Sequence, residues 1–209
     1  MIKTENISYQ YNTTENILEF PDISLKNQES LLILGKSGIG KTTLLHLMAG
    51  LLKPKTGKIT IGDVCLQTLS RKQLDLFIGK NIGLVFQKNY AVKSLNVIEN
   101  IKTRLLFCNK KADNSTISNL LQQLDIEHCK SKKINELSEG QLQRLGIALS
   151  VIHEPKLILA DEPTASLDDE NCKTVMELLL NQASKSNANL IVITHDQRVK
   201  PLFQNILEL

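Results

Sequence analysis

The chain has 209 residues, of which 42% are hydrophobic and 22% are charged. These proportions are typical of a folded globular domain and exclude the low hydrophobicity and high charge of a disordered chain. A formal net charge of +3 is too small to indicate a nucleic-acid-binding protein, so we expect no nucleic-acid partner. The length predicts one sizeable domain with room for a smaller inserted lobe.

The beginning of the chain predicts a small antiparallel sheet. Residues 2–11 and 17–25 have the alternating pattern of short strands, joined by a turn at 12–15. Residues 58–61, which follow a proline and a glycine, are expected to pair with them.

A different pattern follows, in which short apolar runs each end in a polar or glycine-rich residue. Continuous apolar character is what strands need when helices cover both faces of a parallel sheet. Residues 41–52 and 140–152, by contrast, carry apolar side chains at helical spacing. These patterns predict an α/β fold, with the polar strand ends facing one crevice. The four apolar runs are 31–34, 82–86, 157–160 and 190–193.

Residues 94–135 have helical spacing throughout and are the predicted helical subdomain, inserted into a nucleotide-binding core of residues 1–93 and 136–209. No apolar run approaches the roughly 20 residues that span a bilayer. The first residues lack the pattern of a secretory signal, so we expect a cytoplasmic protein. The cysteines lie far apart without metal-binding spacing, and we expect reduced thiols at Cys65, Cys108, Cys129 and Cys172.

A phosphate-binding loop is the first chemical motif. Residues 35–42, GKSGIGKT, match the pattern G-x-x-x-x-G-K-[ST] between a predicted strand and a predicted helix. Glycines let backbone N–H groups converge on phosphate oxygens, Lys41 adds a positive charge, and the Thr42 hydroxyl can bind Mg²⁺. The alternative is a chance glycine turn. We expect nucleotide binding by Gly35, Lys36, Ser37, Gly38, Ile39, Gly40, Lys41, Thr42 and Thr43.

Polar side chains end three other apolar runs. Adjacent residues of a strand point in opposite directions, so Asp161 can bind Mg²⁺ while Glu162 acts as general base or polarises water in phosphoryl transfer to water. Gln87 can offer its amide to Mg²⁺ or to the attacking water, and His195 lies at the same expected sheet edge. The alternatives are solvated strand-end charges, a loop glutamine and a structural histidine.

A capping box marks another helix start. Ser138 and Gln141 have the required spacing, which leaves free N–H groups and the positive end of the helix dipole exposed near Gly140. The segment is either a good helix start alone or a second anion-binding helix end.

With these motifs in order, the sequence resembles the nucleotide-binding subunits of ABC transporters over essentially its full length. The resemblance identifies LSEGQ at 137–141 as the signature and LILADE at 157–162 as the Walker B motif. Glu139 stands where the signature usually has glycine, and Leu149 replaces a common arginine. The remaining assignments are Gln87 as the Q-loop, 166–168 as the D-loop and His195 as the switch histidine.

The resemblance implies a head-to-tail dimer, in which ATP on the loop of one subunit is completed by Ser138 and Gly140 of the other. It also implies that Asp168 belongs to the nucleotide site and that Tyr11 stacks on adenine, with Tyr9 as the alternative.

Within the family, residues 159–168 resemble the lipoprotein-release, macrolide-export and cell-division branch. The expected function is therefore an ATP-binding and ATP-hydrolysing subunit that requires ATP and Mg²⁺ and powers a separate integral membrane permease. Such a subunit pairs with a second ATP-binding subunit and lies on the cytoplasmic face of the membrane, with residues 94–135 helping to dock the permease. The alternative is a soluble ABC ATPase that acts on a cytoplasmic protein assembly.

Overall fold

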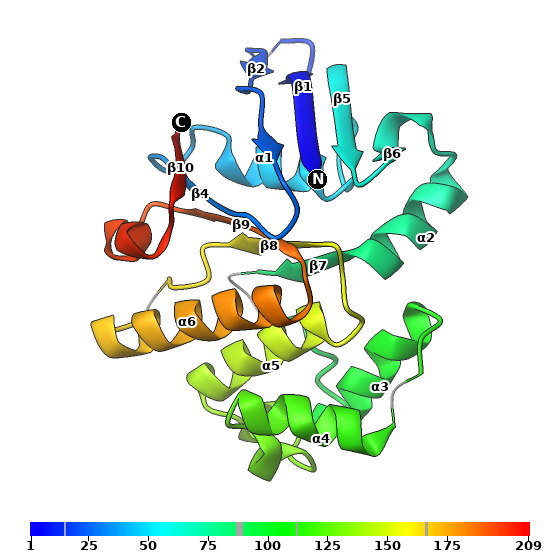
Figure 1. The fold of residues 1–209 in the computed structure, drawn as a ribbon, viewed down its shortest axis with the longest axis vertical. Coiled ribbons are helices and arrows are strands. Elements are labelled where there is room, and N and C mark those ends of the chain that lie inside the picture. The colour runs from blue at the N-terminus through cyan, green and yellow to red at the C-terminus, as the bar shows by residue number, and fades with distance from the viewer. Residues whose placement is uncertain (15, 87–89, 112, 166) are drawn as a thin grey trace.

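A parallel sheet of five strands forms the centre of the computed structural model, which describes residues 1–14, 16–86, 90–111, 113–165 and 167–209 (Figure 1). The strand order is β10-β4-β9-β8-β7, and every neighbouring pair is parallel. The α/β fold is therefore confirmed, and four strands lie at the predicted apolar runs. The strands are β4 (Ser30–Leu34), β7 (Ile82–Val85), β8 (Leu157–Asp161), β9 (Asn189–Thr194) and β10 (Asn205–Glu208).

The continuous apolar runs are explained by two cores, one on each face of this sheet. On β4, Leu32 and Leu34 enter one core, while Leu31 and Ile33 enter the other. α5 (Glu139–Val151) and α6 (Asp169–Lys185) cover the first face, and α1 (Lys41–Met48) packs on the second (Figure 1). Helices cover both faces of β4, β8 and β9, and nearly every residue of these three strands is buried, whereas the edge strand β10 is largely exposed.

The second sheet is antiparallel and covers the core around α1. β1 (Ile2–Tyr9) pairs with β2 (Leu18–Glu19), β3 (Ser24–Leu25) and β5 (Thr56–Ile61), and β6 (Val64–Cys65) extends the sheet. Residues 17–25 do not form the single strand that we predicted. Two short strands flank residues 20–23, because Pro21 has no N–H to donate to the ladder.

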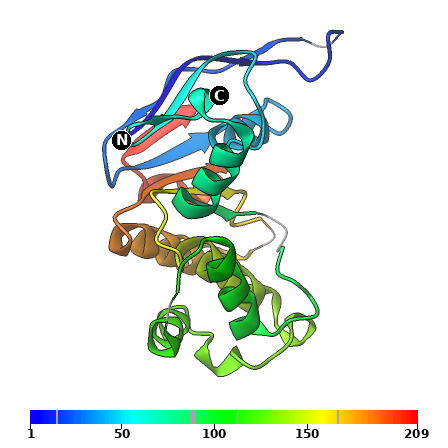
Figure 2. The ribbon, with the colours of Figure 1, turned by 90° about the vertical axis from the view of Figure 1, so that its right-hand side faces the viewer.

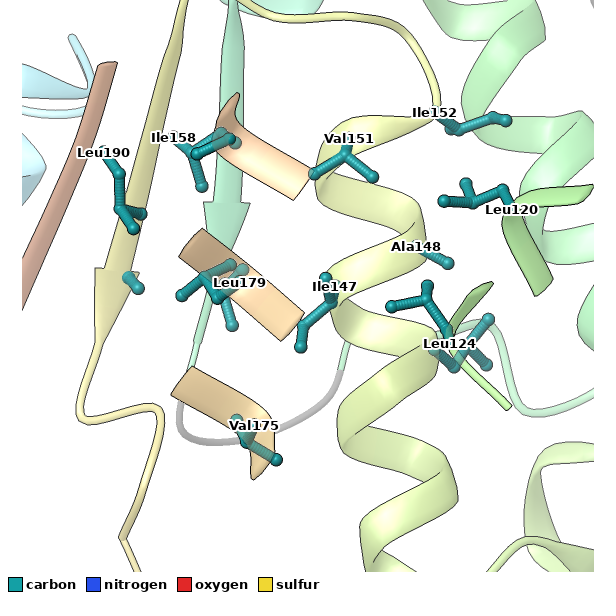
Figure 3. Close-up of a cluster of buried hydrophobic side chains, with 14 of the residues drawn as sticks. Leu120, Leu124, Ile147, Ala148, Val151, Ile152, Ile158, Val175, Leu179 and Leu190 are labelled. Carbon is teal, nitrogen blue, oxygen red and sulfur yellow. The ribbon is translucent and has the colours of Figure 1, made fainter. Parts of the chain in front are cut away.

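The helical lobe lies beyond α5, away from the antiparallel sheet (Figure 2). It contains α3 (Val97–Phe107) and α4 (Asn114–Gln123), each begun by a side-chain cap, from Asn96 and Asp113 respectively. In Figure 3, Leu120 and Leu124 of this lobe face Ala148 and Ile152, and Ile147 points toward Leu179 of α6. The lobe and the sheet thus share one continuous core through α5. The division of the chain at residues 94 and 135 stays a prediction.

Two helices complete the described chain, α2 (Arg71–Asn81) and α6, neither of which we predicted. In the described ranges, no helix combines the length and the apolar character that crossing a membrane requires. All four cysteines are free, and three of them are buried.

Gly83 of β7 lies where α5 crosses the sheet most closely. A Cβ atom there would overlap the Ser150 carbonyl oxygen of α5 and come within 3.2 Å of Pro155 Cγ. We predict that Gly83→Ala lowers the free energy of unfolding by about 1–3 kcal/mol, because backbone atoms must separate to admit the methyl group. Gly140→Ala, where nothing lies within 4 Å of the added carbon, is the matched control. Urea unfolding measures both, and equal midpoints for Gly83→Ala and the parent chain would contradict the close approach.

Candidate nucleotide-binding site

The phosphate loop joins the end of β4 to α1, as the motif predicts. Gly38 and Gly40 have φ angles of 85° and 105°, a left-handed region that other residues rarely adopt. Gly40 caps α1 by its backbone alone, because no side chain accepts a hydrogen bond from the first turn. Free N–H groups therefore begin α1, which is the arrangement that binds anions.

Lys41 is the buried cation of the loop, with only 6% of its surface exposed. Its Nζ donates to the carbonyl oxygens of Gly35, at 2.7 Å, and Lys36, at 3.1 Å. It also lies 3.8 Å from Glu162 Oε1. The ammonium group therefore donates hydrogen bonds to carbonyls of its own loop and pairs with the carboxylate that follows β8 in the same chain.

Thr42 and Thr43 extend in different directions from the first turn of α1. The Thr42 hydroxyl donates to Asp161 Oδ1 at 3.4 Å, which places the two predicted metal ligands side by side. Thr43 is buried, and its hydroxyl lies 2.7 Å from the Tyr11 hydroxyl.

Tyr11 is the more accessible of the two candidate tyrosines, with 53% of its surface exposed. Its ring meets the ring of Tyr9 edge to face, with centroids 4.8 Å apart, while Tyr9 packs against the core under the antiparallel sheet. A free ring face beside the loop is thus available at Tyr11.

Asp161 and Glu162 end β8 and diverge, as predicted. Burial raises the pKa of the Asp161 carboxyl above its usual value, while the hydrogen bond from Thr42 opposes that rise. Glu162 has a left-handed φ of 48°, and its N–H donates to the Ile193 carbonyl at 2.9 Å. The turn carries the Glu162 side chain toward the end of β9 rather than along β8. Such strained residues are concentrated at functional sites.

Glu162 is held from two sides by β9. Oε2 accepts from the Thr194 hydroxyl at 2.7 Å, and Oε1 lies 2.9 Å from His195 Nδ1. The Glu162 side chain is 16% exposed, whereas His195 is 61% exposed. The structure therefore brings Lys41, Thr42, Asp161, Glu162 and His195 together at the carboxyl ends of the strands.

Ser138 and Gly140 lie elsewhere. The Ser138 hydroxyl accepts from Gln141 N, and the Gln141 side chain accepts from Ser138 N, so the predicted capping box forms. Nothing lies within 4 Å of a Cβ built on Gly140. Among the described residues, no hydrogen bond or ion pair joins this helix end to residues 35–42. α1 and α5 pack on opposite faces of the parallel sheet (Figure 1).

Asp168 begins α6, where its carboxylate accepts from the backbone and side-chain nitrogens of Asn171, both at 2.8 Å. These bonds hold the pKa of the Asp168 carboxyl below its usual value. Gln87, the predicted Q-loop residue, and Ser166 of the predicted D-loop lie outside the described residues.

Comparison with known proteins identifies the family. The family model described as ABC transporter matches residues 18–165. The chain belongs to the ABC transporter family. It is 35% identical to the lipoprotein-releasing system ATP-binding protein LolD of Legionella pneumophila strain Lens, over 94% of this chain and 88% of that protein. It is 34% identical to the ABC transporter ATP-binding protein YvcR of Bacillus subtilis, over 94% and 78% of the two chains.

Solved ABC cassettes have the same fold. A dimeric post-hydrolysis state of the ATP-binding cassette MJ0796, bound to ADP and Pi, matches with a TM-score of 0.88 at 30% identity, over 100% of this chain and 94% of the other. CbiO1 of Clostridium perfringens, part of the ABC transporter complex CbiONQ, matches with a TM-score of 0.87 at 31% identity, over 99% and 83%. The predicted ABC ATPase fold and ATPase class are thereby confirmed. The chain is an ATP-binding subunit of the ABC type.

The sequence reasoning missed one polar network close to His195. Arg198 donates to both Asp196 carboxylate oxygens through Nε, at 2.9 and 3.1 Å, and to the Leu167 carbonyl through Nη1 and Nη2, both at 3.2 Å. Asp196 also accepts from the Thr164 hydroxyl at 3.0 Å. These bonds join the segment after β9 to the segment before α6, which contains the predicted D-loop. No local pattern signals it, because Leu167 takes part through its backbone.

The hydrogen bonds from Arg198 hold the pKa of the Asp196 carboxyl well below its usual range. A carboxyl whose pKa is lower in the folded chain than in the unfolded chain stabilises the fold at pH values above its unfolded pKa of about 3.9. This stabilisation is lost as the pH falls below that value. We predict that Arg198→Met destabilises the chain at neutral pH and that its deficit narrows below about pH 4.

Urea unfolding across pH tests this prediction. Lys200→Met is the matched control, since Lys200 lies on the same short helix and forms only an exposed ion pair with Glu208. A deficit for Arg198→Met that is constant across pH, or that Lys200→Met shares, would contradict the assignment.

Proposed function

We propose that this chain binds ATP with Mg²⁺ on the loop at 35–43 and hydrolyses it with water activated at Glu162. The observation that carries the proposal is the position of the Glu162 carboxylate, held by Thr194 and His195 beside Lys41. The Glu162 carboxylate, the His195 imidazole and the Lys41 ammonium group therefore lie together at the end of β8. Positioning and charge stabilisation, which supply most of the catalysis in phosphoryl transfer, are both available there.

Lys41 and Glu162 take separate roles in this proposal. The Lys41 ammonium exchanges the carbonyls of Gly35 and Lys36 for phosphate oxygens, which are stronger partners because they carry charge. Glu162 accepts a proton from the attacking water, and His195 holds the carboxylate in place through Nδ1.

The Mg²⁺ site fits the donors that lie together here. A hydroxyl from Thr42 and a carboxylate from Asp161 are hard oxygen ligands, and Gln87 is the third proposed ligand. The described residues contain no cluster of three or more His, Cys, Asp or Glu side chains that could hold a metal alone. This agrees with a metal bound by few protein ligands and by the nucleotide itself. When bound, Mg²⁺ would neutralise charge on the phosphate oxygens.

A second copy of the chain completes the site in this proposal. Ser138 and Gly140 present a capped, open helix end on the face of the sheet opposite α1, and no hydrogen bond or ion pair among the described residues joins them to the loop of their own chain. A head-to-tail pair places this end and Asp168 against the loop of the other chain. The dimeric state of the MJ0796 cassette supports such an arrangement.

We propose that an integral membrane permease docks in a groove of about 560 Å³ between the core and the helical lobe. The groove is lined mostly by apolar side chains, with Lys93, Arg104 and Glu139 as charged groups. An amphipathic helix of a permease fits such a surface. The chain would then lie on the cytoplasmic face of a membrane. The apolar lining includes Ile78 of α2, Val85 of β7, Leu142 and Leu149 of α5, and Tyr90.

Glu162→Gln tests the hydrolysis step. We expect ATP turnover to fall by roughly 10²- to 10⁴-fold, because an amide cannot accept the proton from water. Static light scattering with ATP and Mg²⁺ should show a dimer that persists, since the nucleotide is bound but not hydrolysed. A monomer at saturating ATP would contradict the dimer mechanism.

Lys41→Ala is the companion variant, and calorimetry should find that it no longer binds ATP. Unaltered ATP affinity would exclude the proposed role of Lys41.

Tyr11 is the proposed adenine platform, and its substitution tests that choice. Tyr11→Ala should weaken ATP binding about two- to tenfold, because an aromatic stack contributes roughly 0.5–1.5 kcal/mol. Tyr11→Phe retains the ring and loses only the bond to Thr43, so it should bind ATP nearly as the parent chain does. Isothermal calorimetry measures both affinities. If Tyr11→Ala binds unchanged, the platform lies at another residue.

A further inference from the structure

Three large apolar side chains are exposed together where α2 meets the end of α3. Leu106 and Phe107, the last two residues of α3, are 72% and 75% exposed, and Leu76 of α2 is 47% exposed. The two helices touch here, because Cys108 Sγ donates to the Gly79 carbonyl at 2.9 Å. We call Leu76, Leu106 and Phe107 the apolar patch. Contiguous exposed apolar groups of this size indicate a binding surface.

Lysines lie near the apolar patch. Lys72 and Lys80 stand one helical turn before and after Leu76, and Lys102 stands one turn before Leu106. Lys111 follows α3. All four are exposed, and among the described residues none has a hydrogen-bond or ion-pair partner for its ammonium group. Lys110, by contrast, pairs with Glu154. We call these four unpaired cations, which stand on or just after the two helices that carry the apolar patch, the lysine rim.

The same two helices border the proposed docking groove. Ile78 of α2 and Arg104 of α3 line it. Each is two residues from Leu76 or Leu106, a spacing that places the side chains on different sides of a helix. α2 and α3 lie one above the other at the front of Figure 2, with their outer faces uncovered by other elements. In the proposed function the groove faces the membrane that holds the permease, and the apolar patch lies beside the groove, outside its lining.

We propose that the apolar patch and its lysine rim bind the surface of an anionic lipid bilayer. Apolar side chains that enter the headgroup region, beside lysines that attract anionic lipids, are the two components of peripheral membrane binding. A protein partner would be expected to pair each lysine with a carboxylate at a fixed position. A bilayer needs no such match, because its anionic headgroups can move to the lysines. The orientation of this face rests on the proposed function, but the lipid contact itself needs no permease.

Vesicle co-flotation of the full chain tests the proposal directly. Vesicles of phosphatidylcholine with phosphatidylglycerol should bind the chain at least about tenfold more strongly than vesicles of phosphatidylcholine alone, and about 1 M salt should weaken that binding. The double variant Leu106→Ser with Phe107→Ser should lose about tenfold or more. Exchange of the four rim lysines, Lys72, Lys80, Lys102 and Lys111, for glutamine should also lose about tenfold or more.

Matched controls distinguish an effect of the apolar patch and its lysines from a general effect of net charge or of exposed apolar surface. Glutamine at Lys26, Lys58, Lys173 and Lys185 removes the same charge from other elements, and Leu51→Ser with Ile206→Ser removes exposed apolar side chains elsewhere. Both controls should bind anionic vesicles as the parent chain does. All variants should retain ATP affinity, since none alters residues 35–43 or the residues that contact them.

Absence of binding to anionic vesicles would overturn the proposal, as would equal losses in the control variants or full binding by the serine double variant. If the chain instead binds only membranes that contain its permease, the apolar patch belongs to the permease interface and the lipid proposal is wrong. The vesicles contain no permease, so either result leaves the tests of Glu162 and Lys41 standing.

Discussion

The parallel direction of β4, β8 and β9 is the constraint on which the rest of the molecule depends. Parallel strands end at one edge, so the turns that follow them meet although their sequences are far apart. Thr42 and Asp161 are 119 residues apart and share a hydrogen bond. The same alignment sets Glu162 against Thr194 and His195, 32 and 33 residues away. Each strand must be buried on both faces to keep this alignment, which is why α1, α5 and α6 are needed.

The electrostatics of the site follow from that convergence. One buried cation, Lys41, stands near two carboxylates, and the loop carbonyls supply its remaining partners. The contacts satisfy a charged group that would otherwise be costly to bury, and phosphate oxygens can replace them without moving the backbone. Burial raises the pKa of the Asp161 carboxyl, because the partly buried group is less well hydrated than a surface carboxylate.

Local signals explain what the sequence could predict. The phosphate loop, the Ser138 capping box and the double-sided apolar strands each depend on residues close together in the chain, and all three are present. The single strand at 17–25 was wrong because Pro21 interrupts the ladder. α6 was readable, since Cys172, Val175, Met176 and Leu179 have helical spacing, yet it was not identified. The Arg198 network could not be read from the sequence, because two of its partners, the Leu167 carbonyl and the Asp169 carboxylate, are about 30 residues away in the chain. The Gln87 prediction stays a prediction.

The two anion-binding helix ends of the chain face different ways for a reason that lies in the sheet. α1 follows β4 and packs on the side of the antiparallel sheet, while α5 precedes β8 and packs on the side of the helical lobe. Among the described residues, no hydrogen bond or ion pair joins the two helix ends across the sheet that separates the helices. Under the proposed function, a site that uses both ends is shared between two chains. In that arrangement the same α5 that offers Ser138 to the second chain also lines the groove proposed for the permease, through Leu142 and Leu149. In this proposal, closure of the nucleotide site is linked to movement at the groove, because the same rigid helix takes part in both.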